Sequence, residues 1–509
     1  METAETREAS TEHPGVSSLA SEDYVIKAMP AILGTGDMIA SYIVALFFIT
    51  NTAIIATGGT AALTYIVLGA LVFLLPCVIA TAQLGTIFPH EGSLYNWTHK
   101  ALGGYWSFFI GICLWLSGVL AIVLATNAFT TLIQGLNAGW VTEPWQQGLL
   151  MIGLIIVTAV IATRRFRAVQ NLINIIVVLT LAAVVITGVA ALAWLITGHI
   201  AATSFRHVDD WSITPANFWL FGPAVLSFLG IISPLNMAGE ITDSRGKQGR
   251  NIITRHLLWG TLIIFACYFI SIFALLVIRG QAVISVQALP FEIIATVDAA
   301  LGKFAGTLMA ICVLGYCVSA AIFYTYSSAR ILMVAAIDGR IPVSLGKLNR
   351  NRVPANATIF QAICAILITI VIFIIVVFII VPYAITIGAS PATTVSRLYT
   401  INAATLSIIW TIAITFLFID IIFLYWRDPA HFRRLRILPM PLLWLSVAVG
   451  FSACLANIVG TLYYSWVPQI IGRNSWWYII GGLTLFCLLI ALGVSLLANS
   501  QADWQNIRT

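Results

Sequence analysis

Charged side chains are scarce in this sequence of 509 residues. Lys, Arg, Asp and Glu make up 9% of the chain, whereas hydrophobic residues make up 60%. A soluble globular protein carries roughly 25% of these four charged residues, and so apolar a chain has too few polar groups to cover a surface in water. The composition therefore predicts an integral membrane protein and excludes a soluble enzyme, a disordered scaffold and a DNA-binding domain.

Motifs for metals and nucleotides are also missing. The eight cysteines lie inside apolar runs without a Cys-x-x-Cys pair, so we expect small core residues instead of a zinc site or disulfide framework. No Gly-x-x-x-x-Gly-Lys-Ser/Thr loop of a nucleotide-driven pump occurs. We therefore expect no enzymatic activity, cofactor or resident metal, and no nucleic-acid or nucleotide partner. The expected partners are a small-molecule solute and the lipid bilayer.

Apolar runs recur along the whole chain, and a membrane-spanning helix needs roughly 20 apolar residues. About twelve spans fit with short loops. The predicted spans are 25–51, 58–82, 105–135, 147–162, 170–198, 216–240, 254–279, 303–337, 358–381, 396–426, 441–466 and 476–498. Residues 1–23 are polar and acidic and are interpreted as a disordered cytoplasmic tail, and residues 500–509 as a cytoplasmic C-terminal tail.

Positive charge is distributed unevenly between the two sides of these spans. With the N-terminus in the cytoplasm, 20 of the 25 Lys and Arg residues fall on the inner side. The positive-inside rule therefore supports an even number of spans with cytoplasmic N- and C-termini. We expect a multi-pass protein of the plasma (cytoplasmic) membrane.

Two of the predicted spans are interrupted by residues that weaken helices. The first span contains Gly34-Thr35-Gly36-Asp37 near its middle, and the sixth contains Gly222-Pro223, Gly230 and Ser233-Pro234. The two spans lie five apart, so the breaks occupy corresponding positions of two five-span halves that are inverted relative to each other. Such a pair of breaks is typical of a transporter with a binding site at the midplane. Two ordinary kinks would leave the same pattern.

Asp37 and Asp420 are the two acids well inside predicted spans, and no His, Lys or Arg is comparably deep. Asp37 is expected near the bilayer centre, where a carboxylate marks a functional site by default. It is a candidate proton carrier or partner of a substrate ammonium. Alternatively, it caps the second half-helix by accepting backbone N–H bonds. Asp420 is expected to pair with Arg427.

Charged and aromatic residues near the ends of the spans give further candidates. Glu240 closes the sixth span beside Asp243 and Arg245, and we interpret this as an inner charge network in which Glu240 and Arg245 are candidates for an inner gate. Aromatic residues that would gate the path or stack on a solute, unless they serve simple packing, are Tyr42, Trp219, Phe228, Tyr324 and Tyr326.

Four stretches of the sequence resemble the amino acid–polyamine–organocation permeases, which have the LeuT-type fold. These stretches are residues 88–97 with Leu102-Gly103, Phe228-Leu229-Gly230 with 236–240, 338–342 with 353–357, and 290–330. The resemblance extends over roughly residues 25–430. It implies an all-α membrane protein with broken helices 1 and 6: a five-helix repeat at 24–200, an inverted repeat at 201–430, and two C-terminal helices at 431–499.

The resemblance also implies where a solute binds. The family's first-helix cradle, whose backbone N–H groups hold a substrate carboxylate, falls on Ala40-Ser41-Tyr42. Ser41 matches the family pattern, whereas Ala40 and Tyr42 replace glycines, and Tyr42 would crowd an ordinary α-amino acid. The candidate substrate-binding residues are Gly34, Gly36, Asp37, Ala40, Ser41, Tyr42, Phe228, Gly230, Ile231 and Ser233.

Candidates for ion coupling follow from the same resemblance. The fifth-helix lysine of many proton-coupled members falls on Thr180, and a hydroxyl group cannot supply the fixed positive charge of that lysine. Two choices stay open: sodium held by Thr180 or Ser319, and a proton taken by Asp37.

Together, these features predict a secondary active transporter. It would move an amino acid or related amine-bearing solute by alternating access, with proton coupling, sodium coupling or exchange. One alternative is a carrier for a solute without an α-carboxylate, such as a polyamine, another organocation or a heterocycle. Another is a sensor that binds a solute on the same scaffold without transporting it.

Overall fold

The computed structural model is an all-α protein, and it describes residues 19–137, 139–244, 246–280, 289–375, 391–466 and 471–508. Within these residues, ten helices are long and apolar enough to cross a membrane. They overlap the predicted spans two to five and seven to twelve. Their bounds are Ala61–Ile87 (α4, η1 and α5), Gly104–Leu136 (α7), Pro144–Ala162 (α8), Phe166–Ile196 (α9), Lys247–Ile278 (α11), Lys303–Ile337 (α13), Ala355–Ile375 (α14), Pro391–Arg427 (α16), Met440–Tyr463 (α18) and Arg473–Arg508 (α19).

The predicted first and sixth spans are each divided into two short helices. The first comprises α2 (Thr35–Leu46) and α3 (Asn51–Ala56), and the sixth comprises α10 (Phe221–Leu226) and η4 (Ser233–Glu240). The all-α membrane fold with breaks in these two segments is therefore as expected. The total of twelve spans and the inverted repeat stay predictions.

The break in the first span does not lie where the sequence placed it. Gly34 is the extended residue before α2, and Asp37 lies in the first turn of that helix. The helix then continues through Ala40, Ser41 and Tyr42, and its backbone becomes non-helical only at 47–50. In the sixth span the break surrounds Gly230, as predicted, whereas Gly222 and Pro223 lie in the first turn of α10, where proline is tolerated.

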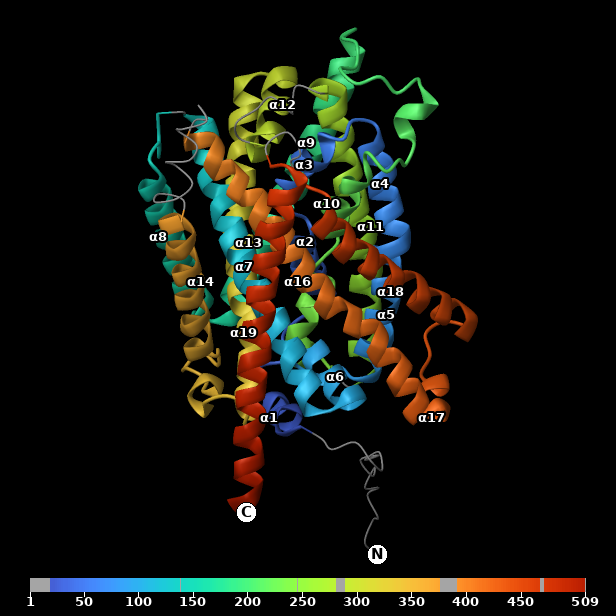
Figure 1. Cartoon of the computed structure of the whole chain (residues 1–509), viewed down its shortest axis with the longest axis vertical. Coiled ribbons are helices and arrows are strands. Elements are labelled where there is room, and N and C mark those ends of the chain that lie inside the picture. The colour runs from blue at the N-terminus through green and yellow to red at the C-terminus, as the bar shows by residue number, and fades with distance from the viewer. Residues whose placement is uncertain are drawn as a thin grey trace, which may run out of the picture.

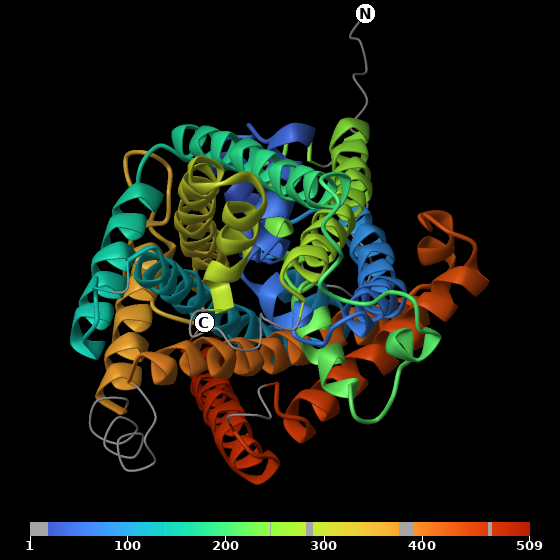
Figure 2. The same cartoon turned by 90° about the horizontal axis from the view of Figure 1, so that it is seen from above.

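The long helices are stacked roughly side by side, with short helices at both ends (Figure 1). We call one end the α1 end, because α1 (Ala20–Ala28) lies there with α6 (Leu94–Leu102) and α17 (Pro429–Arg434). The opposite end carries α12 (Glu292–Leu301) and is called the α12 end. Seen from above, the blue first span lies inside the bundle (Figure 2), where α2 contacts α9, α11 and α13.

The helix α1 was not expected as a separate element. It begins at Ala20, inside the predicted disordered tail, and an extended segment at 29–34 joins it to α2. Leu33 in that segment forms a parallel bridge with Ile241, directly after η4. The remainder of the predicted tail, residues 1–18, lies outside the described residues. The two broken spans are thus tied together by backbone contacts near the α1 end.

Candidate functional site

The break between α2 and α3 is held by hydroxyl groups from neighbouring helices. Tyr268 of α11 donates a hydrogen bond to the carbonyl oxygen of Leu46 at 2.9 Å and accepts one from the N–H of Phe48 at 2.9 Å. Tyr324 of α13 donates to the carbonyl oxygen of Ala45. An unpaired backbone group in lipid costs several kcal/mol, so these tyrosines maintain a break that has no glycine or proline.

The two broken spans meet at this point. The side-chain amide of Asn51 in α3 donates to the carbonyl oxygen of Pro223 at 3.0 Å and to the hydroxyl of Ser227 at 2.8 Å. Gly230 has a φ of 102°, and a Cβ atom there would lie 2.8 Å from the carbonyl oxygen of Ala45. Position 230 therefore requires glycine both for its backbone conformation and for its close approach to the first span.

Aromatic rings surround the meeting point of the two breaks. Phe228 packs edge-on against Tyr268 with 5.8 Å between ring centroids, and Phe48 stacks on Tyr324 at 6.1 Å. Trp410 of α16 packs edge-on against Tyr324 at 5.7 Å. The residues in these contacts are uncharged, so the surface around the two breaks consists of aromatic rings and backbone polar groups.

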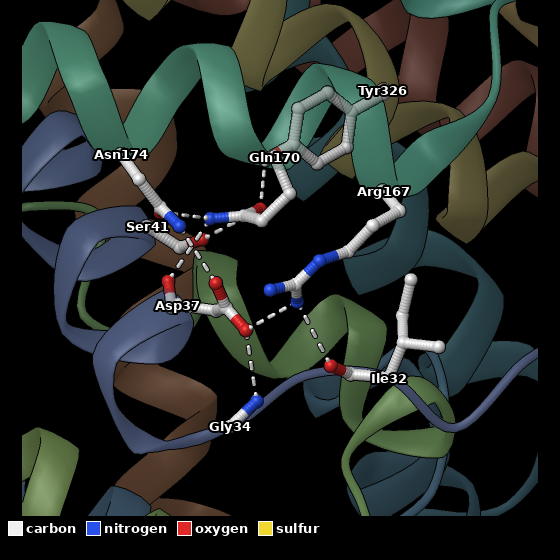
Figure 3. A network of polar contacts seen from close by, with 8 residues as sticks. All are labelled: Ile32, Gly34, Asp37, Ser41, Arg167, Gln170, Asn174 and Tyr326. Atoms are coloured by element: carbon white, nitrogen blue, oxygen red, sulfur yellow. Dashed lines mark hydrogen bonds and ion pairs between the residues drawn. The ribbon is translucent and has the colours of Figure 1, made fainter.

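Asp37 belongs to a second group of residues at the start of α2 (Figure 3). One carboxylate oxygen accepts the N–H of Gly34 at 3.1 Å and lies 2.8 Å from Nη1 of Arg167, whose side chain is 48% exposed. The other oxygen accepts a hydrogen bond from Asn174 of α9 at 2.7 Å. Asp37 therefore caps a helix, as the capping alternative expects, but this helix is α2, the first part of the broken span; its roles as proton carrier or substrate partner stay predictions. The expected place near the middle of a span is wrong, because α2 begins only two residues earlier.

Gln170 extends this group to three helices (Figure 3). Its amide nitrogen donates to the carbonyl oxygen of Asp37 at 3.1 Å, and its Oε1 accepts hydrogen bonds from Ser41 at 3.4 Å and Tyr326 at 3.3 Å. The group therefore joins α2, α9 and α13. Gln170 was not among the predicted residues, and the sequence carries no signal that distinguishes it from an ordinary polar residue.

The cradle implied for residues 40–42 is not formed. These residues lie inside α2, where backbone N–H groups are used by the helix itself. The ring of Tyr42 points towards α11, where its hydroxyl shares a hydrogen bond of 3.0 Å with Thr261 and Gly260 leaves room for the ring. Tyr42 therefore does not crowd the break, which lies one helical turn further along the chain.

Glu240, a predicted inner-gate residue, pairs with Arg330. Glu240 accepts a hydrogen bond from Arg330 of α13 at 2.8 Å, and both side chains are fully buried. Arg245 lies outside the described residues. Arg330 lies near the end of α13, where its charge is paired with Glu240 and covered by the ring of Phe166 at 4.7 Å.

The remaining predicted residues are dispersed. Thr180 and Ser319 are buried, and their hydroxyls donate to carbonyl oxygens of their own helices at 2.9 and 2.8 Å. Asp420 accepts a hydrogen bond from Thr98 of α6 at 2.7 Å, while Arg427 donates to the carbonyl of Lys100. The expected pair of Asp420 with Arg427 is therefore wrong: each has a partner on α6.

Four further predicted residues lie in or next to the two broken spans. Gly36 lies in the first turn of α2, and Ile231 lies in the sixth break. Ser233 begins η4, and its carbonyl oxygen accepts a hydrogen bond from Ser327 at 2.8 Å. Trp219 precedes α10. Among the described residues, no group of three or more His, Cys, Asp or Glu is placed to hold a metal ion.

Comparisons with known proteins agree with this architecture. The lysine-specific permease LysP of Escherichia coli is 25% identical over 381 residues, which are 70% of this chain and 72% of that protein. The γ-aminobutyric acid permease of Escherichia coli is 24% identical over 353 residues (65% and 70%). The aromatic amino acid transport protein AroP of Corynebacterium glutamicum is 23% identical over 346 residues (65% and 70%).

The fold is also similar to that of a solved transporter. The manganese transporter of Eremococcus coleocola superposes with a TM-score of 0.57 at 16% identity, over 94% of this chain and 97% of that one. At this identity, the likeness shows a shared fold alone. A family model for amino acid permeases matches residues 31–500. The resemblance found in the sequence is thus confirmed: the chain belongs to the amino acid permease family.

Proposed function

We propose that this protein is a secondary active transporter of the plasma membrane that moves an amino acid or a related amine-bearing solute by alternating access. The observation that carries the proposal is the contact between Gly230 and the carbonyl of Ala45, which brings the breaks of the first and sixth spans together. Broken helices that meet in this way are typical of transporter binding sites. The relatives named above transport lysine, aromatic amino acids or γ-aminobutyric acid, which supports an amine-bearing solute.

The proposed solute site lies at residues 45–48, where α2 ends and the break begins, and not at the expected cradle at 40–42. A solute amine would replace the hydroxyls of Tyr268 and Tyr324 at the carbonyl oxygens of Leu46 and Ala45. The N–H of Phe48 would be free to bind a carboxylate once Tyr268 has moved. Phe228 and Gly230 complete the site from the sixth span.

We place the inner gate at the α1 end, which we take to be cytoplasmic because of the positive-inside distribution. The pair of Asp37 and Arg167 joins α2 to α9, and the pair of Glu240 and Arg330 joins η4 to α13. Both pairs connect a broken span to a continuous helix. Movement of the broken spans would separate both pairs and admit the solute from the cytoplasm.

The break also supports the second candidate, a solute without an α-carboxylate. Its hydrogen bonds involve two carbonyl acceptors, from Ala45 and Leu46, but a single N–H donor, from Phe48. Two acceptors suit an ammonium group, whereas a carboxylate needs donors. A polyamine or another organocation is therefore a chemically reasonable occupant of this site.

Uptake into proteoliposomes tests both candidates. Purified protein would be supplied with labelled lysine, phenylalanine, γ-aminobutyric acid and putrescine, with and without imposed proton and sodium gradients. We expect concentrative uptake or exchange of at least one of these solutes. Uptake of putrescine alone would favour the second candidate. Thermal stabilisation by a solute that is neither accumulated nor exchanged would identify a sensor and contradict the proposal.

A further inference from the structure

Three buried charged side chains meet where the sixth span ends. Glu240 is the last residue of η4, Arg330 lies towards the end of α13, and Glu91 lies in the loop between α5 (Leu75–Ile87) and α6. Their exposed fractions are 0%, 0% and 3%. The group therefore combines a broken span, a continuous helix and a loop in one buried site.

The contacts within this group are unequal. Nη2 of Arg330 lies 2.8 Å from Oε1 of Glu240, whereas its Nε lies 3.5 Å from Oε1 of Glu91. The other oxygen of Glu91 accepts the N–H of Gly239 at 2.9 Å. Oε1 of Glu91 and Oε2 of Glu240 have no hydrogen-bond partner. Glu240 is thus the close partner of Arg330, and Glu91 is the weakly bound one.

The charges of the group do not balance if both acids are ionised. Two carboxylates face one guanidinium, whose Nη1 donates a hydrogen bond to the carbonyl oxygen of Tyr326 at 2.9 Å and which lies against the rings of Phe166 and Tyr326. A buried charge without compensation is strongly unfavourable, and such a group takes up a proton instead. Burial, and then the neighbouring Glu240, raise the pKa of Glu91 well above its usual range, although Arg330 opposes this change.

We propose that Glu91 is a proton-binding site, which holds a proton while Arg330 is paired with Glu240 and releases it when η4 moves away from α13. This proposal rests on the proposed transport function, because it supplies the coupling ion. When Glu240 leaves, the negative charge that opposes ionisation of Glu91 is removed. Arg330 then becomes available to the Glu91 carboxylate, and the proton passes from its oxygen to cytoplasmic water.

Other titratable or charged groups surround this site and have to be separated from it. His90 precedes Glu91 and lies 3.6 Å from Glu22 of α1, which is 2.7 Å from Lys100 of α6. The groups on the elements packed around the site are Glu22, Asp23 and Lys27 of α1, His99 and Lys100 of α6, Arg167 of α9, Tyr326 of α13, and Asp338 and Asp243 in the adjoining loops. Asp338 is the group most easily confused with Glu91, because burial raises the pKa of its carboxyl as well, whereas burial lowers the pKa of His99 to about 4.

The pH dependence of thermal stability tests the site without any solute. A raised pKa in the folded state means that the folded protein binds a proton that the unfolded chain releases. The stabilisation is therefore complete below about pH 4, the ordinary range of a glutamate, and is lost as the pH rises through the folded-state pKa. We expect the melting temperature of the wild-type protein to fall between pH 5 and pH 8.

Single-residue variants test whether Glu91 causes the pH dependence of the melting temperature. Glu91→Gln mimics the protonated acid and should keep a melting temperature that changes much less with pH. Glu240→Gln should also flatten the profile, because it removes the charge that opposes ionisation of Glu91, and it tests the site even if Glu91→Gln does not fold. Asp338→Asn and His90→Gln should keep most of the wild-type fall in melting temperature. His99→Gln should not flatten it, because burial lowers the pKa of His99 to about 4 and this histidine therefore makes stability rise with pH. A wild-type fall in both Glu91→Gln and Glu240→Gln, or its loss in Asp338→Asn or in either histidine variant, would overturn the proposal.

Uptake separates this proposal from the proposed function. In proteoliposomes, solute accumulation by the wild-type protein should rise several-fold with an inward proton gradient, and Glu91→Gln should lose this stimulation. Transport that ignores the proton gradient would overturn the proton site and leave the transporter intact. Absence of transport for every solute would overturn the proposed function, while the melting profiles would still decide whether Glu91 binds a proton.

Discussion

Gly230 of the sixth span and Ala45 of the first approach so closely that a Cβ atom at position 230 would lie 2.8 Å from the carbonyl oxygen of Ala45. Each residue lies at or beside the break of its own helix. The contact therefore fixes the relative position of the two breaks, which form the proposed solute site. Substitutions at this contact should affect both folding and transport.

Gly230→Ala should destabilise the protein and reduce uptake. The new methyl group would meet the Ala45 carbonyl, and a φ of 102° is unfavourable for any residue other than glycine. Backbone strain of this kind costs on the order of 1–3 kcal/mol. Melting temperature and initial uptake rate measure the effect. Gly153→Ala is the matched control, since a Cβ atom there has no neighbour within 4 Å; an equal loss in both variants would contradict the expectation.

Tyr268→Phe should destabilise the solute-free protein by about 1–3 kcal/mol, because Leu46 and Phe48 lose their shared hydroxyl partner. A solute that binds at these groups should restore part of the loss, so its stabilising effect should be larger in the variant than in the wild type. Thermal-shift measurements with the transported solute check this difference. Tyr65→Phe is a suitable control, since it removes a hydrogen bond to Asn217 away from the break; an enhanced solute effect there as well would argue against the site.

Asp37→Ala should open the α1 end more often, because it removes the contacts of α2 with Arg167 and Asn174. A cysteine introduced at Ser41, which is fully buried in the same network, would report this opening. We expect a several-fold faster reaction with a thiol reagent supplied from the cytoplasmic side. The wild-type background carrying the same cysteine is the reference, and an unchanged rate would exclude Asp37 from the gate.

The partners of Asp420 can be compared by double-mutant cycles. Asp420 and Thr98 share a hydrogen bond of 2.7 Å, so their coupling energy should be about 1 kcal/mol. The coupling between Asp420 and Arg427 should be close to zero, because Arg427 binds the carbonyl of Lys100. Both cycles would use the melting of purified protein. A larger coupling to Arg427 than to Thr98 would show that the ion pair expected from the sequence does form.

Hydropathy alone predicts the ten long helices, because apolar length is set directly by the bilayer, although single helix ends differ from the prediction by up to about ten residues, as at Lys247 and Arg508. Glycine and proline also located the sixth break, where Gly230 has a positive φ. The first break was misplaced because Phe47-Phe48-Ile49-Thr50 contains no helix-breaking residue. Its unwinding depends on hydroxyls of Tyr268 and Tyr324, which are more than 200 residues away in sequence and carry no local signal.

The distribution of charged residues predicts which side of the membrane each loop faces, but it does not predict which residues form ion pairs. The sequence marked Glu240 as a gate residue, yet its partner Arg330 lies 90 positions away on another helix. The sequence predicts Asp37 as a possible helix cap, but it places Asp37 in the middle of one helix, because hydropathy does not separate α1 and the segment at 29–34 from α2. Long-range pairing of this kind depends on the packing of helices, which a single sequence does not specify.

Solute uptake by variants with a larger side chain at the meeting point of the breaks tests the central claim most directly. Gly230→Val and Gly153→Val would be compared with the wild type in proteoliposomes, at matched protein content and with a folded fraction measured by size-exclusion chromatography. We expect Gly153→Val to accumulate solute at the wild-type rate and Gly230→Val to lose accumulation at least tenfold. Undiminished uptake by a well-folded Gly230→Val would contradict a solute site between the two broken spans.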